Sequence, residues 1–227
     1  MDLSLLEENL DIAFNDKDLL KQAFIHRSYL NENPDVGLPH NERLEFLGDA
    51  VLELAVTEYL YNTYPNPEGE LTNWRASLVN SKTLATIAER LDFNLFLLLS
   101  KGEARDMGKA RNYILANTLE AFIGALYLDR GFKEASMFIE AYILTELPTI
   151  LQERLYIDPK SRFQELAQEY VGITPSYDVL TETGPDHAKY FVVGVFVGDE
   201  KVAEGEGSSK QEAEEAAAQN AIETKRW

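Results

Sequence analysis

The feature that most restricts how this chain can fold is a helical segment over residues 41–55, with acids on one side and apolar groups on the other. At 100° per residue, Glu42, Glu45 and Asp49 fall within roughly 60° of one helix face. The opposite side carries Leu44, Leu47, Val51, Leu54 and Ala55. Such a helix is buried along its apolar side while its carboxylates meet at the rim of a groove. The three acids form either a site for a hard cation or simply a solvated face.

Length and composition indicate a folded protein without a membrane segment. The chain has 227 residues, of which 45% are hydrophobic, enough for one large or two modest domains. Its apolar runs are far shorter than the ~20 residues that a membrane span needs, and residues 1–4 do not begin an export signal. The absence of cysteine means that any metal must be held mainly by oxygen. We expect a cytoplasmic protein with no membrane partner.

The charge of the chain bears directly on its partners. A formal net charge of −18 ordinarily counts against nucleic-acid binding, because phosphate binding relies on Lys and Arg. An acidic groove that collects divalent cations is compatible with this charge if basic side chains are concentrated where phosphates lie. The distribution of Lys and Arg therefore has to be examined segment by segment.

The first part of the chain, residues 1–150, is expected to be a helical domain. Helical periodicity of 3.6 residues is present in four segments, namely 18–24, 41–62, 75–91 and 113–128. Residues 65–69 form a turn after the acidic helix, and Thr72 is the expected N-cap of the next helix. Tyr59, Tyr61, Tyr64 and Trp74 are interpreted as core and helix-packing residues.

A second domain is expected over residues 158–227, after a linker over 151–157. Asp158-Pro159 marks a helix start, because Pro is tolerated at the first helical position. The pattern then predicts a helix over 161–170, strands over 177–182, 189–197 and 200–205, and a helix over 210–222. This α-β-β-β-α order indicates a small sheet covered by two helices on one face. The predicted fold class is therefore an all-helical domain followed by an α+β domain.

A second pair of oxygen-bearing side chains lies on another predicted helix. Asn117 and Glu120 are three residues apart and share a helix face. Two helices can thus direct oxygen ligands at each other. Mg²⁺ prefers such ligands together with retained waters, and a pair of these ions assists phosphodiester cleavage.

The sequence resembles the bacterial ribonuclease III family. The resemblance rests on the run Asn41-Glu-Arg-Leu-Glu-Phe-Leu-Gly-Asp49, on Glu68-Gly69, and on Leu115-Ala-Asn-Thr-Leu-Glu-Ala121, and it covers essentially the whole chain. Members of this family join an all-helical nuclease domain to a double-stranded-RNA-binding domain. The resemblance implies an endoribonuclease of double-stranded RNA, active in ribosomal RNA precursor processing and turnover of structured messenger RNA.

The resemblance also implies roles for individual residues. The metal-binding positions of the family correspond here to Glu45, Asp49, Asn117 and Glu120. Asp49 and Glu120 correspond to the essential catalytic pair, and Glu42 and Glu68 also line the catalytic valley. The implied cofactor is Mg²⁺, for which Mn²⁺ can substitute, and the implied products carry 5′-phosphate and 3′-hydroxyl ends with short 3′ overhangs.

One position departs from the family pattern. The residue matching Asn117 is usually Asp in this family, so a formal charge is missing from the expected metal site. An amide oxygen still ligates Mg²⁺, but with a weaker field. We expect activity to survive with an altered metal demand. The alternative is a double-stranded-RNA-binding protein of the same fold that has lost cleavage.

The acidic helix is also a candidate dimer seam. Phe46 lies about 40° from Glu42 on the helical wheel, on the acidic side rather than the buried side. The simplest interpretation is a locally covered core residue. In the family, however, the matching Phe packs into a socket on a second subunit, and Gly48 lets helices approach closely. We therefore expect a C2 homodimer with Phe46 and Gly48 at its interface.

The C-terminal domain carries most of the expected RNA contacts. By resemblance, Gln164 and Glu165 contact one minor groove, His187 the next, and Ser208, Ser209 and Lys210 the phosphates between them. Residues 158–227 contain seven Lys or Arg against fourteen Asp or Glu, so this basic patch is thin. Further phosphate contacts are expected from the nuclease-domain loop at Arg105, Lys109 and Arg111, which is otherwise an ordinary solvated loop.

One further segment matches the family without a chemical assignment. The run His26-Arg27-Ser28-Tyr29 is assigned a structural role, because a lone His beside an apolar helix is more often a hydrogen-bonded packing residue than a base.

Overall fold

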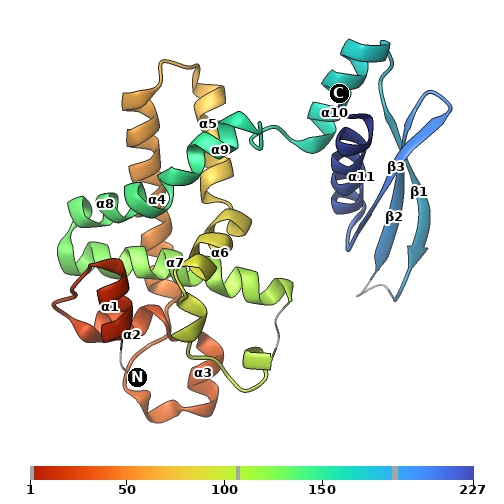
Figure 1. The fold of residues 1–227 in the computed structure, drawn as a ribbon. Coiled ribbons are helices and arrows are strands. Elements are labelled where there is room, and N and C mark those ends of the chain that lie inside the picture. The colour runs from red at the N-terminus through yellow and green to blue at the C-terminus, as the bar shows by residue number, and fades with distance from the viewer. Residues whose placement is uncertain (1–2, 106–107, 186–188) are drawn as a thin grey trace. The chain divides into compact units, whose positions relative to one another are not determined.

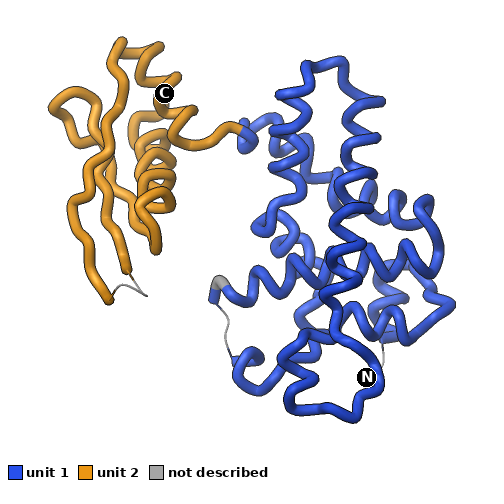
Figure 2. Tube along the Cα trace, turned by 180° about the vertical axis from the view of Figure 1, so that it is seen from behind, with its two compact units in different colours: residues 1–156 blue, residues 157–227 orange. Residues whose placement is uncertain are grey.

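The protein forms two compact units, residues 1–156 and residues 157–227 (Figure 2). They are seen in a computed structural model that describes residues 3–105, 108–185 and 189–227. Each unit has its own hydrophobic core.

The first unit is helical, as the periodicity predicts (Figure 1). Its α-helices are α1 (Ser4–Leu10), α2 (Lys17–Ala23), α3 (Arg27–Glu32), α4 (Glu42–Thr63), α5 (Glu68–Val79), α6 (Ser81–Arg90), α7 (Lys109–Arg130), α8 (Phe132–Tyr142) and α9 (Leu147–Gln152). Short 3-10 turns occur at Pro34–Val36, Phe93–Leu95, Glu103–Arg105 and Leu144–Glu146. Helices α4 and α5 form a hairpin, and α7 crosses α4.

Helix α7 lies in the middle of the first unit. Its apolar residues Leu115, Leu119 and Ile123 are completely buried. The ring of Phe122 packs edge-on or tilted against other aromatic rings, with centroids 5.3 Å from Phe93 and 5.0 Å from Phe138. This enclosure fixes α7 on most of its circumference, so the few polar side chains that it carries are held in defined places.

The start of the acidic helix α4 is anchored by a buried amide. Asn41 is 3% exposed, its side chain donates to the carbonyl of Ala23 at 3.0 Å, and its backbone N–H donates to Ile25 at 2.9 Å. A buried amide that satisfies backbone groups in this way defines the position of the helix end. The first turn of α4, which carries Glu42 and Glu45, is thereby fixed against the segment before α3.

The region after α4 differs from the prediction at two points. The expected helix over 75–91 is divided at Asn80, whose side chain accepts a hydrogen bond from the N–H of Thr83 at 2.9 Å and so caps α6. Helix α5 begins at Glu68, so Thr72 is not an N-cap. The hydroxyl of Thr72 donates instead to the Glu68 carboxylate at 3.0 Å.

Two residues expected in the core lie at the surface. Leu54 is 58% exposed and Tyr61 is 77% exposed, whereas Trp74 is buried as predicted. On the helical wheel Leu54 lies at the edge of the apolar side, so local periodicity assigned it to the wrong surface. Both exposed residues lie on the same side of α4 as Phe46.

The second unit confirms the predicted α-β-β-β-α order. It consists of α10 (Pro159–Val171), β1 (Ser176–Thr183), β2 (Tyr190–Val197), β3 (Glu200–Gly207) and α11 (Lys210–Lys225). The three strands form an antiparallel sheet in the order β1-β2-β3. Both helices cover one face of it (Figure 1), where Phe163, Val195 and Ala217 are completely buried.

The first unit extends further along the chain than the sequence indicates, to residue 156 and not 150, and the second unit begins at residue 157 against an expected 158. Residues 151–157 are expected to form a linker, but all except residue 157 belong to the first unit. The ring of Tyr156 packs edge-on against Trp74, with centroids 6.0 Å apart, and Trp74 also contacts Tyr64 at 5.2 Å. These aromatic contacts hold the end of the first unit on α5.

Candidate active site and RNA-binding surface

Two glycines bring the acid-bearing turns of α4 and α7 together. A Cβ atom added at Gly48 would lie 1.7 Å from the carbonyl oxygen of Glu120, and one added at Gly124 would lie 2.2 Å from that of Leu44. Only glycine permits such a close backbone crossing. The crossing places Glu45 and Asp49 of α4 beside Asn117 and Glu120 of α7. The crossing also explains why position 48 is a glycine. Gly48 is buried against α7 of the same chain and does not lie on a free dimer surface.

The carboxyl group of Glu120 lies at the centre of this acidic face. Burial raises its pKa to about 8, and the nearby charges of Asp49 and Glu45 act in the same direction. Glu120 is therefore largely protonated at neutral pH when no cation is near it. The charges of Asp49 and Glu45 thus act on Glu120 from the neighbouring helix.

Glu45 is held differently, because it has a hydrogen-bond donor beside it. Burial raises the pKa of the Glu45 carboxyl, and the charges of Glu42 and Asp49 raise it further. A hydrogen bond from the side chain of Asn117 lowers that pKa. The amide at position 117 therefore compensates part of the negative charge, which a carboxylate in its place cannot do.

The donor chemistry of this face suits a hard divalent cation. Carboxylate and amide oxygens are the ligands that Mg²⁺ prefers. Over residues 3–105, 108–185 and 189–227, however, no three His, Asp or Glu side chains form a group arranged to hold a metal ion. The raised pKa of Glu120 favours its neutral form, and the amide of Asn117 carries no charge, so both lower the negative charge of the face. The metal site expected from the sequence remains a prediction.

Two basic side chains that sequence reasoning did not assign to the site contact Glu42. Arg27 Nη1 lies 3.4 Å from Glu42 Oε1, and His40 Nδ1 lies 3.7 Å from Glu42 Oε2. Glu42 itself is exposed at the start of α4. The sequence signal for Arg27 is the run His26-Arg27-Ser28-Tyr29, to which sequence reasoning assigns only a structural role.

Comparison with protein-family models identifies both units. Residues 16–147 match the model described as Ribonuclease-III-like, and residues 159–225 match the model described as double-stranded RNA binding motif. The chain belongs to the ribonuclease III family. It is a ribonuclease III-type enzyme whose second unit is a double-stranded-RNA-binding domain, which confirms the family and fold class indicated by the sequence.

Curated relatives match over almost the whole chain. Ribonuclease 3 of Oceanobacillus iheyensis is 46% identical over 225 residues, which cover 99% of this chain and 98% of the relative. Ribonuclease 3 of Natranaerobius thermophilus is 47% identical over 223 residues, covering 98% and 96%. The similarity therefore includes both units and the segment that joins them.

A solved structure matches the first unit. The nuclease domain of ribonuclease III from Campylobacter jejuni is 41% identical, with a TM-score of 0.58, and the match covers 65% of this chain and 97% of that domain. A second structure of that domain, with the same identity and TM-score, concerns flexibility in a region involved in its dimer formation. The helical unit of this ribonuclease III thus has the nuclease-domain fold.

Glu68, an expected valley residue of this ribonuclease III, is not brought to the other acids within one chain. It lies at the start of α5, beside the far end of α4, and lines a groove of about 430 Å³. The other lining residues are Thr57, Leu60, Tyr61, Asn66, Leu71, Thr72 and Arg75. At 1.5 Å per residue, Leu60 is already about 16 Å along the helix from Asp49.

The side of α4 next to its acids is apolar and open. Phe46 is 82% exposed, Leu54 58% and Tyr61 77%, and the three lie within about 80° of one another on the helical wheel. Exposed aromatic and apolar residues aligned along one helix are typical of an interaction surface. Phe46 is therefore not a covered core residue of one chain.

One expected contact of the RNA-binding domain, Gln164, lines a hollow together with Gln211, which the sequence did not single out. Gln164 of α10 and Gln211 of α11 line one hollow of about 560 Å³, and Glu165 and Lys210 are exposed beside them in sequence. His187 lies outside the described residues. Lys210 Nζ lies 5.8 Å from the centre of the Phe191 ring.

Acids occupy much of the surface where phosphates are expected to bind. The N–H and hydroxyl of Ser208 both donate to the Glu212 carboxylate, at 2.8 and 2.6 Å, while Ser209 Oγ caps α11 by accepting from the N–H of Glu212. Lys160 pairs with Glu214, a residue of the same hollow. This domain has few basic residues, and internal ion pairs further reduce the number of basic side chains available to bind phosphate.

The nuclease-domain loop offers fewer phosphate contacts than expected. Arg105 is exposed at the end of a 3-10 turn, and α7 begins at Lys109, whose side chain lies outside the described part of the structure. Arg111 is 8% exposed, and its Nη2 donates to the carbonyl of Ala104 at 3.3 Å. Arg111 is therefore a buried brace of this loop rather than a surface contact, which corrects the prediction.

No helix in the described part of the chain has the length and apolar character required to cross a lipid bilayer.

Proposed function

We propose that this ribonuclease III is a Mg²⁺-dependent endoribonuclease that hydrolyses both strands of double-stranded RNA. The observation that carries the proposal is the half-buried carboxyl of Glu120, whose pKa is raised to about 8 by burial and by Asp49 and Glu45 across the α4–α7 crossing. The proposed products have 5′-phosphate and 3′-hydroxyl ends with short 3′ overhangs, and Mn²⁺ can replace Mg²⁺. Processing of ribosomal RNA precursors and turnover of structured messenger RNA are the proposed roles.

Four residues are proposed to hold the cation, namely Glu45, Asp49, Asn117 and Glu120. All offer oxygen. The pKa of Glu120 is raised first by burial and then by the charges of Asp49 and Glu45, and a cation at this place offsets that repulsion. The chemistry that a bound divalent cation supplies is neutralisation of charge on the phosphate and a lower pKa for attacking water. Glu120 loses its proton when the cation binds, because the positive charge favours the carboxylate form.

The remaining chemistry belongs to the side chains. In hydrolysis, water oxygen bonds to phosphorus, the bond from phosphorus to the 3′-oxygen breaks, and a proton passes from the water to that oxygen. Asp49 and Glu120 are proposed to accept hydrogen bonds from the attacking water and so orient it toward phosphorus. Cysteine is absent from the sequence, and the proposed reaction uses no protein nucleophile.

We propose that the active enzyme is a C2 homodimer. Phe46 is 82% exposed, and the groove of about 430 Å³ that Tyr61 and Leu71 line on a second copy offers apolar surface for an aromatic ring. In a two-fold arrangement each Phe46 enters the groove of the other copy. Glu68 lies in that groove, so the dimer supplies this acid to the partner's acidic face, which one chain alone does not.

The experiment that tests the function is an assay of a long RNA duplex with the full chain and Mg²⁺. We expect short duplex products with 5′-phosphates, none in the presence of EDTA, and none from a single-stranded RNA of the same sequence. The Glu120→Gln variant should bind the duplex without cutting it. Absence of cleavage by the unmodified chain, with Mg²⁺ and Mn²⁺ alike, would refute the proposal.

A second candidate function is double-stranded-RNA binding without cleavage. It is favoured by one observation, the Asn117 amide, which donates a hydrogen bond to Glu45 where the family usually has a carboxylate. The same assay separates the two functions. Duplex binding without cleavage by this chain, combined with cleavage by the Asn117→Asp variant, would establish the second function.

A further inference from the structure

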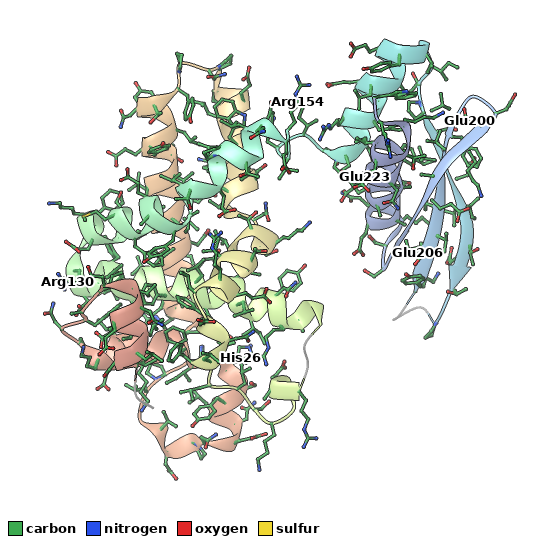
Figure 3. The ribbon with its side chains drawn as sticks, viewed as in Figure 1. His26, Arg130, Arg154, Glu200, Glu206 and Glu223 are labelled. Atoms are coloured by element: carbon green, nitrogen blue, oxygen red, sulfur yellow. The ribbon has the colours of Figure 1, made fainter. Side chains whose placement is uncertain are left out.

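The segment before α3 is hydrogen-bonded to residues 98–100 and, through Asn41, to the start of α4. Leu98 N donates to Phe24 O at 2.9 Å and His26 N donates to Leu98 O at 3.1 Å. His26, labelled in Figure 3, is the N-cap of α3, and its Nδ1 lies 2.8 Å from Ser28 Oγ. Ser28 Oγ also accepts from the N–H of Ser100 at 3.1 Å. Together with the buried Asn41 amide, these bonds hold the backbone of Arg27 in a fixed place beside Glu42.

The side chain of Arg27, in contrast, is exposed and has a long ion-pair contact. It is 70% exposed, and its Nη1 lies 3.4 Å from Glu42 Oε1, longer than the usual 2.7–2.9 Å of a charge-assisted hydrogen bond. His40 lies 3.7 Å from the other oxygen of the same carboxylate and is 38% exposed. An exposed, loosely held ion pair contributes little to stability, so Arg27 can exchange its partner at little cost.

Positive charge is needed at this place. An RNA phosphate that approaches this face meets the acids Glu42, Glu45 and Asp49 of α4, on a chain whose formal net charge is −18. Arg27 and His40 lie at the edge of this acidic face, where both contact Glu42, the first residue of α4. Both side chains contact the Glu42 carboxylate, which, like a phosphate oxygen, is negatively charged and accepts hydrogen bonds.

We propose that Arg27, assisted by His40, binds a backbone phosphate of duplex RNA beside the acidic face, and that Glu42 holds both side chains when no RNA is bound. The proposal rests on the proposed function, since it takes double-stranded RNA as the ligand. It differs from a purely structural role, in which Arg27 only orients Glu42.

The test measures binding of the full chain to an RNA duplex of about 30 base pairs, longer than the roughly 16 that such a domain spans, in EDTA so that no cleavage occurs. Dissociation constants are measured over a series of salt concentrations. Arg27→Ala should weaken binding about tenfold at low salt and reduce the salt slope by about one. Arg27→Lys should recover part of both, because it keeps the charge.

Glu42→Gln distinguishes the two roles of Arg27. If Arg27 binds phosphate, removing its competitor carboxylate should strengthen RNA binding while Arg27→Ala weakens it. If Arg27 only orients Glu42, then Arg27→Ala leaves the dissociation constant and the salt slope unchanged and lowers kcat as Glu42→Gln does. That second result overturns the proposal.

The matched control is Arg90→Ala. Arg90 also forms an exposed ion pair, 2.7 Å from Glu146, and is 52% exposed, so its loss removes the same charge from a similar surface pair elsewhere in the first unit. Its binding constant and salt slope should equal those of the unmodified chain. An equal loss of RNA affinity in both variants would mean that the effect comes from net charge alone and would overturn the proposal. Failure of the unmodified chain to bind or cut the duplex would instead refute the proposed function.

Discussion

Gly48 and Gly124 face each other where α4 crosses α7, and a Cβ on Gly124 would lie 3.0 Å from the backbone nitrogen of Gly48. The same Cβ would lie 2.2 Å from the carbonyl oxygen of Leu44, so backbone meets backbone at this point. Asp49 directly follows Gly48, and Glu120 precedes Gly124 by one helical turn. The distance between the two acid-bearing turns is therefore set by the absence of two side chains.

Gly124→Ala should lower the free energy of unfolding by about 3 kcal/mol, because the backbone atoms that its Cβ meets cannot move aside without shifting a helix. Urea unfolding measures the effect. Gly69→Ala is the control, since a Cβ at this helical position meets no atom within 4 Å and should stabilise by about 0.5–1 kcal/mol. Equal stability of Gly124→Ala and the unmodified chain would contradict the close crossing.

Metal-free protein should lose stability as the pH rises. The Glu120 carboxyl has a pKa of about 8 in the folded chain against an ordinary 4.5, so its contribution is complete below about pH 4.5 and is lost as the pH rises through about 8. Glu45, whose pKa is also raised, acts in the same direction. We expect a fall of roughly 3–5 kcal/mol, measured by urea unfolding in EDTA.

Glu120→Gln should remove most of that pH dependence, because its amide does not titrate. Added Mg²⁺ should also restore stability to the unmodified chain at about pH 8–9, since a cation favours the carboxylate form. The same pH profile for the variant and the unmodified chain would show that Glu120 is not the titrating group.

Asn117→Asp should tighten cation binding and destabilise the cation-free protein. The new carboxylate adds negative charge beside Glu45 and removes the amide donor that now lowers the pKa of Glu45. We expect a loss of about 1–2 kcal/mol in EDTA and a lower Mg²⁺ concentration for half-maximal cleavage. Asn117→Ala, which removes donor and acceptor alike, serves as the control. An unchanged Mg²⁺ dependence in Asn117→Asp would argue against a ligand role for this position.

Phe46→Ala should weaken the proposed dimer. Removing a buried aromatic anchor from an interface costs about 2–4 kcal/mol, which corresponds to a dissociation constant at least about 30-fold higher. Analytical ultracentrifugation over a concentration series measures it. Leu95→Ala is the control, because Leu95 is 71% exposed and lies outside α4. A monomeric unmodified chain at micromolar concentration would refute the dimer.

Glu212→Gln should strengthen binding of duplex RNA. Its carboxylate now occupies the N–H and hydroxyl of Ser208, which are expected to meet a phosphate. Loss of this competing charge should lower the dissociation constant about threefold to tenfold at low salt, at a cost of about 0.5–1 kcal/mol in helix capping. Glu223→Gln makes the same change near the other end of α11 (Figure 3) and should have little effect. Equal effects of both variants would point to net charge alone.

The sequence by itself determined the order of the elements and the chemistry of the site. Periodicity predicted the helical first unit and the α-β-β-β-α second unit, because burial on one side of a helix or strand leaves a local repeat in the chain. The wheel positions of Glu42, Glu45 and Asp49, and of Asn117 with Glu120, follow from helix geometry alone. Those residues are available to sequence reasoning because their relation is local.

Only the tertiary structure decided which of these groups meet and which are exposed. Arg105 precedes α7 and Arg111 lies in its first turn, yet Arg105 is exposed and Arg111 is buried, because burial depends on packing partners and not on position along the chain. Glu68 lies apart from the acids because α5 folds back along the far end of α4. Arg27 reaches Glu42 only through the hydrogen bonds that join their two segments. Such long-range contacts have no period in the sequence.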